Sequence, residues 1–258
     1  SENYAALAFN SELIYIHNME GSLDMDIISS KLYLDDINTT FTGKISLSDN
    51  YLVAVTSNPI GLLIVERNND NTNSWQKNAE TNNHNQFNYQ NINSFGFSVD
   101  SVDEHIIVGC PDIKKAYIFN YNNGWSTSNI VILENSSGNF GYQVAITKND
   151  AIVSNPSDNQ INIYYKSNNG LWINQPVVTL LAPTNVSNFG TRFSYSGNYL
   201  LVSGVINGIT KLYLYKKENE EWGNQPTSII SNSSYSDFGS NFSIFSKQKD
   251  VVFITEPE

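Results

Sequence analysis

The dipeptide Phe-Gly returns in this chain at a nearly constant interval. It occurs at positions 95, 140, 189 and 238, which are 45, 49 and 49 residues apart, and tryptophan follows a similar interval at Trp75, Trp125, Trp172 and Trp222. A fixed period of this size marks a repeat architecture, in which each unit buries its apolar face against its neighbours. The repeat therefore predicts one domain with a continuous core.

A single repeat, residues 140–188, predicts four short strands. Residues 141–146 alternate apolar and polar side chains, and two further apolar segments at 151–153 and 161–165 are separated by a stretch that contains Pro156. Asn169-Gly170 supplies a tight turn, and Trp172 opens a fourth segment that ends at residue 181. Four antiparallel strands in about 45 residues are typical of one β-propeller blade.

The remaining repeats predict an all-β propeller with five blades. Four blades span residues 41–94, 95–139, 140–188 and 189–237. The fifth combines 238–258, which supply strands one and two, with 1–40, where 13–17 and 27–34 supply strands three and four. Pairing the two termini closes the ring and removes exposed strand edges. In an alternative, residues 5–9 form the second strand, which would imply further blades in a longer chain.

The repeated pattern resembles the FG-GAP repeat family, which includes the integrin α-subunit head and some fungal lectins. It reads Phe-Gly-x-x-Val, a turn, Val-Gly-x-Pro and Tyr-x-Phe, and residues 95–99, 108–111 and 117–119 match it best. The resemblance covers about residues 41–258, and it implies a propeller used for binding or adhesion. Many members carry an Asp-rich calcium loop within the repeat. This chain has only the pairs Asp24/Asp26 and Asp35/Asp36, so we expect no metal and no other cofactor.

Charge and composition exclude two classes of partner. The net charge is -11, from 14 basic and 25 acidic residues, which argues against nucleic acid. The sequence has no apolar run near 18 residues, so membrane insertion is not expected. The single cysteine, Cys110, lies in an apolar run, which predicts a buried structural thiol.

No residue constellation predicts catalysis. His17, His84 and His105 fall in different blades, which favours packed or solvated histidines over a metal site. The innermost strands are expected to point ten side chains toward the axis: Lys44, Ser46, Ser98, Asp100, Gln143, Thr147, Arg192, Ser194, Asn241 and Ser243. Only Asp100 is acidic, whereas glycosidases need two carboxyl groups. We expect Arg192 to neutralise Asp100 across the channel, and we predict that the protein is not an enzyme.

The candidate ligand-binding residues are Trp75, Trp125, Trp172, Trp222, Asp100 and Arg192. The tryptophans fit either packing between blades or stacking on sugars. The Asn-rich insertion at 68–93 is either an interaction surface or a low-complexity segment without a partner.

The function predicted from the sequence is a non-enzymatic binding or scaffold propeller on a cell or particle surface. The predicted location is extracellular or on a particle surface, with a cytoplasmic location as the alternative, and the predicted partner is a protein or a glycan. A lectin and a structural component of a large virus particle are the alternatives, and a glycosidase is the least favoured one. These functional expectations rest on the family resemblance, because a propeller fold by itself does not specify a function.

Overall fold

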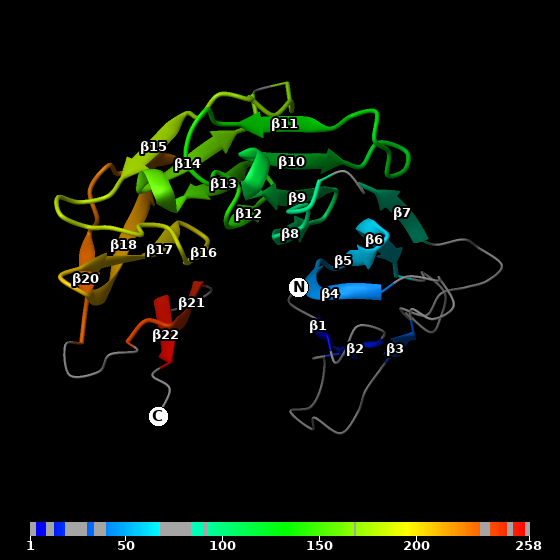
Figure 1. Ribbon diagram of the computed structural model, residues 1–258, viewed down its shortest axis with the longest axis horizontal. Coiled ribbons are helices and arrows are strands. Elements are labelled where there is room, and N and C mark those ends of the chain that lie inside the picture. The colour runs from blue at the N-terminus through cyan, green and yellow to red at the C-terminus, as the bar shows by residue number, and fades with distance from the viewer. Residues whose placement is uncertain are drawn as a thin grey trace.

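β-Strands make up nearly all of the regular structure in the computed structural model (Figure 1). The structure describes residues 4–8, 13–18, 30–33, 40–67, 84–89, 92–167, 169–232, 238–246 and 250–255, with side chains for 40–67, 87–89, 92–167, 169–232 and 238–244. No helix within these residues has the length and apolarity that a bilayer crossing requires.

Four antiparallel sheets follow one another along the chain, and within each the strand order follows the sequence. Blade 1 contains β4 (Thr40–Leu47), β5 (Tyr51–Asn58), β6 (Ile60–Glu66) and β7 (His84–Asn88). Blade 2 contains β8 (Ser98–Val102), β9 (His105–Cys110), β10 (Lys115–Asn120) and β11 (Val131–Glu134). Blade 3 contains β12 (Val144–Ile146), β13 (Asp150–Asn155), β14 (Gln160–Tyr165) and β15 (Val178–Leu181). Blade 4 contains β16 (Phe193–Ser196), β17 (Tyr199–Ile206), β18 (Ile209–Glu218) and β20 (Ser228–Ile230), and β19 (Glu221–Trp222) pairs antiparallel with the end of β18.

These sheets are arranged as blades of a β-propeller. The first strands β4, β8, β12 and β16 lie toward the centre of a curved array, and the last strands β7, β11, β15 and β20 lie at its rim (Figure 1). The predicted four-stranded unit is therefore confirmed in blades 1 to 4. Strand β7 lies inside the Asn-rich insertion and pairs with β6, so the described part of that insertion completes a blade. Residues 68–83 and 90–91 of the insertion lie outside the described residues.

The two ends of the chain lie in separate sheets, which corrects the predicted mixed blade. Strands β1 (Tyr4–Ala8), β2 (Leu13–Asn18) and β3 (Ser30–Tyr33) form one sheet, and β21 (Asn241–Ser246) pairs with β22 (Asp250–Thr255) in another. The prediction placed β22 against β2, but β1 occupies that edge of β2, from the pair Tyr4–Asn18 to the pair Ala8–Ile14. The alternative with a second strand at residues 5–9 describes the N-terminal sheet correctly. Strand β21 lies beside β16, and β1 lies beside β4.

The Phe-Gly dipeptide joins each blade to the preceding one. The four phenylalanines of the dipeptide are at most 5% exposed, and so is Phe41 of blade 1, where Thr42 separates the phenylalanine from Gly43: Phe41, Phe95, Phe140, Phe189 and Phe238. Gly141 shows why the second residue is glycine. Its φ is +92°, and an added Cβ would lie 2.3 Å from the carbonyl oxygen of Lys115 in blade 2. Both the positive φ and the close approach of two backbones exclude a side chain here.

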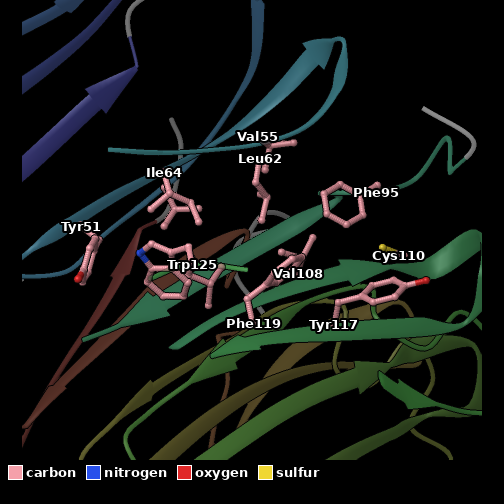
Figure 2. Close-up of a cluster of buried hydrophobic side chains, with 12 residues drawn as sticks. Tyr51, Val55, Leu62, Ile64, Phe95, Val108, Cys110, Tyr117, Phe119 and Trp125 are labelled. Carbon is pink, nitrogen blue, oxygen red and sulfur yellow. The ribbon is translucent and has the colours of Figure 1, made fainter. Parts of the chain in front are cut away.

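The hydrophobic core is divided among the interfaces between blades. Figure 2 shows the cluster between blades 1 and 2, where Val55, Leu62 and Ile64 face Val108 and Phe119. A second cluster joins blades 2 and 3, and a third joins blades 3 and 4. Cys110 belongs to the first cluster, is fully buried, and has its pKa raised to about 12 by desolvation. The predicted structural thiol is thereby confirmed.

Candidate functional site

The three described tryptophans lie in the interfaces between blades. The exposed fractions of Trp125, Trp172 and Trp222 are 7%, 7% and 6%. Trp125 meets Tyr51 of blade 1 edge-on, with ring centroids 5.2 Å apart, and Trp172 meets His105 of blade 2 edge-on at 5.6 Å. Such pairs stabilise packing. Stacking on a sugar needs an open ring face, so the structure does not support that role for these three. Trp75 lies outside the described residues, as do the side chains of His17 and His84.

Asp100 links three neighbouring blades through hydrogen bonds. Its Oδ1 accepts from Ser46 Oγ of blade 1 at 3.2 Å, and its Oδ2 accepts from the backbone N of Ile146 of blade 3 at 2.9 Å. Desolvation raises the pKa of Asp100, and these hydrogen bonds act in the opposite direction. The carboxyl group is therefore engaged in holding the inner strands together.

The expected pairing of Arg192 with Asp100 is wrong. Arg192 Nη1 instead donates to Asn241 Oδ1 at 2.9 Å, in the neighbouring strand β21. The reason is depth along the axis. Arg192 lies two residues after the glycine of its repeat and Asp100 lies four residues after its own, which separates them by about 7 Å along the strands.

A cavity of about 520 Å³ opens where the innermost strands begin. Its lining consists of Gly43 and of residues one to three positions after the glycine of each repeat, so the four blades and β21 all contribute to this axial cavity. Five of the ten side chains that the sequence pointed at the axis line it: Lys44, Ser98, Gln143, Arg192 and Asn241. The other five are not among its lining residues, and three of them, Ser46, Asp100 and Ser194, take part in hydrogen bonds between neighbouring innermost strands.

The axial cavity is positively charged, although the chain is strongly acidic. Lys44 and Arg192 line it, and no carboxylate is among its described lining residues. Phe97 and Tyr142 add an aromatic wall, with ring centroids 4.8 Å apart, and Phe97 is 44% exposed. The amide of Gln143 is fixed, because its Nε2 donates to the carbonyl oxygen of Phe193 and its Oε1 accepts from the N of Phe193, both at 2.8 Å.

Sequence reasoning missed Phe97 and Tyr142. The available signal was their position directly after the repeat glycine, where other repeats carry lysine, threonine or serine. Because other repeats carry a polar residue at this position, packing between blades does not require an aromatic side chain there. These two residues give the axial cavity an apolar contact surface beside its charged groups.

A second cavity of about 380 Å³ lies at the opposite ends of the inner strands. Its lining comes from the turns that follow the first strands of blades 1, 2 and 3, together with the residue after β14. Five residues of this turn cavity carry acidic or basic side chains: Asp103, Glu104, His105, Lys148 and Lys166. The two cavities therefore occupy opposite faces of the blades.

Comparison with known proteins supports the fold. No protein-family model matches the sequence, and no curated protein matches it. Hsv2 of Kluyveromyces marxianus is similar in structure, with a TM-score of 0.63 and 12% identity over 98% of this chain and 74% of that chain. Hsv2 of Kluyveromyces lactis gives 0.59 and 11% identity over 94% and 70%. A Lactobacillus plantarum protein gives 0.51 and 12% identity over 90% and 69%. At such identities the likeness shows the fold alone, and this fold is a β-propeller of several blades.

Proposed function

We propose that this protein is a non-enzymatic binding propeller that holds a partner at the axial cavity. One contrast carries the proposal. The phenylalanine and glycine of the repeats that begin at 95, 140, 189 and 238 are buried between blades, whereas the side chains that line the cavity differ from blade to blade. Positions that every blade needs for packing stay the same within a repeat protein, so positions that vary are available for binding.

The charge of the cavity indicates an acidic group on the partner. The net charge of -11 makes the rest of the surface attractive to basic groups. Lys44 and Arg192 make the axial cavity attractive to an acidic group instead. A volume of about 520 Å³ falls within the usual range for small ligands, and it accommodates a few side chains of a protein segment. We infer that a protein segment carrying a carboxylate enters the cavity beside Phe97 and Tyr142.

The hydrogen bonds of Asp100 agree with a binding role rather than a catalytic one. Asp100 accepts hydrogen bonds from two neighbouring blades, which leaves it poorly placed to act as a general acid or base. The resemblance to FG-GAP repeats supports adhesion on a cell or particle surface as the setting of this binding. That setting and the family assignment belong to the proposal.

The number of blades is a further part of the proposal. Because the two ends lie in separate sheets, we infer that the described strands occupy six blade positions rather than five. Electron microscopy of the purified chain, which counts blades directly in a view down the axis, tests this inference. A five-bladed ring would contradict it.

Selection from a display library of random peptides tests the binding site. The wild-type chain should enrich peptides rich in Asp and Glu, and the double variant Lys44→Glu/Arg192→Glu should lose them because both cavity cations are reversed. Lys114→Glu is the matched control, since this lysine follows β9 outside the cavity lining. Equal enrichment by the double variant and the control would refute the site.

A further inference from the structure

Neighbouring blades contact one another at a position that recurs in each interface. One residue at the end of the third strand donates its backbone N–H to the turn before the second strand of its own blade. Tyr121 and Lys166 directly follow β10 and β14, and Lys217 is the last but one residue of β18. The side chains of these three residues face the first residue of the second strand in the preceding blade. The recurring pairs are therefore Tyr121 with Tyr51, Lys166 with His105, and Lys217 with Asp150.

Charge is balanced in two of these interfaces but not in the third. Tyr121 and Tyr51 are uncharged partners, with ring centroids 5.8 Å apart. Lys217 Nζ lies 3.0 Å from Asp150 Oδ1 and 3.1 Å from its Oδ2, so the buried ammonium is neutralised. In the interface of blades 2 and 3, His105 occupies the position that Asp150 occupies in the interface of blades 3 and 4.

Lys166 consequently lacks an acidic partner. Its Nζ contacts His105 Nε2 and lies 5.2 Å from the centre of the Trp172 ring. No carboxylate of the described residues lies within 4.0 Å of it. Burial, followed by the charge of Lys166, lowers the pKa of His105 to about 4, and His105 Nδ1 has no hydrogen-bond partner among the described residues. The pair thus combines an uncompensated ammonium with an unsatisfied ring nitrogen.

The turn cavity lies directly beside this pair. Its volume is about 380 Å³, and Lys148 lines it together with Lys166 and His105. Asp103 and Glu104 also line it, both as exposed residues of the turn before β9. Burial lowers the pKa of Lys166, and the charge of Glu104 acts in the opposite direction, so this carboxylate is near, but no ion pair joins the two. Because Asp103 and Glu104 lie at the opening of the cavity, they would repel a large or highly charged anion, so only a small anion would fit between the lysines.

We propose that the turn cavity binds a small oxyanion, such as phosphate, sulfate or a carboxylate, between Lys148 and Lys166. The anion would supply Lys166 with the negative charge that the Asp150 carboxylate supplies to Lys217 in the next interface. This site lies on the face of the blades opposite the axial cavity and does not depend on the proposed function.

Thermal unfolding with added anions tests the proposal. Sodium phosphate, sulfate and acetate are compared with sodium chloride at equal ionic strength and pH 7.5. At tenfold above its Kd, a bound anion should raise Tm by about 3–6 °C, in a saturable manner. Phosphate and acetate as separate arms distinguish a phosphate group from a carboxylate as the preferred ligand. The absence of any saturable rise over chloride would overturn the proposal.

Three variants assign the effect to this site. His105→Asp supplies the carboxylate found in the next interface, so it should abolish the anion response while keeping the Tm measured in chloride. Lys166→Met should also abolish the response, and His105→Asp keeps the test valid if that variant does not fold. Lys114→Met removes a cation outside the cavity and should retain the full response. An undiminished response in His105→Asp would mark a general salt effect and overturn the proposal.

Discussion

Replacing Lys217 with methionine should strongly destabilise the interface between blades 3 and 4. The side chains of Lys217 and Asp150 are only 7% and 5% exposed, and Lys217 Nζ contacts both carboxylate oxygens. Methionine keeps most of the volume of the lysine stem and removes its charge. Asp150 would then remain buried as a carboxylate, with the hydroxyl of Tyr195 at 3.2 Å as its remaining side-chain donor.

The size of this effect follows from the burial of both partners. Removing one partner of a buried ion pair costs about 3–5 kcal/mol, because the other charge is left uncompensated. At about 2–4 °C for each kcal/mol in a chain of this size, Tm should fall by roughly 6–20 °C. The second contact of Lys217, 3.4 Å from Glu220, adds little because that glutamate is 87% exposed.

Urea titration and thermal unfolding of Lys217→Met at pH 7 measure this loss. Lys216→Met is the control, since Lys216 pairs with the exposed Glu218 and should cost less than about 1 kcal/mol. The double variant Lys217→Met/Asp150→Asn should recover part of the stability, because it removes the stranded charge. A loss below about 1 kcal/mol for Lys217→Met, or the same loss for both lysines, would refute the reasoning.

Three further perturbations test the packing and the electrostatics. Gly141→Ala should cost at least about 2 kcal/mol in urea titration, and more than Gly43→Ala, because both glycines have positive φ but only the first lacks space for a Cβ. The low pKa of His105, about 4 against 6.5 unfolded, predicts stability that is complete above pH 6.5 and falls as pH drops toward 4. Solvent screening reduces this loss to about 1–2 kcal/mol, and His105→Gln should remove it in titrations at pH 7 and 4.5. Trp125→Ala should cost about 3–5 kcal/mol of stability, whereas a loss of glycan-array binding without unfolding would restore the sugar-stacking role.

The local sequence pattern was sufficient to predict the individual blades but not which strands pair at the two ends of the chain. Alternating side chains and tight turns act over a few residues, so the four-stranded sheets could be predicted from each repeat. The mixed blade failed because two apolar segments, at residues 4–8 and 250–255, both suit the edge of β2. Which of them pairs there depends on the packing of whole sheets, which a repeat pattern does not contain.

The arrangement of the axial cavity, too, could be predicted only in part from the sequence. The period-two register pointed Lys44, Gln143 and Arg192 at the axis, and the structure places them there. The distance of each residue from the glycine of its repeat already placed Arg192 and Asp100 at different depths along the axis, and the predicted pairing did not take this into account, so it was wrong. The turn cavity arises between blades, and its basic pair could be found only by aligning the ends of strands from different repeats in space.

The central claim is that the axial cavity holds an acidic group of a partner. The most direct test is calorimetric titration of the peptide enriched by the wild-type chain against Arg192→Glu and Lys114→Glu. Reversing a charge in contact with the ligand should weaken binding at least tenfold, about 1.4 kcal/mol or more, and the control should bind as the wild type does. Equal Kd values for Arg192→Glu and the wild type would contradict the account.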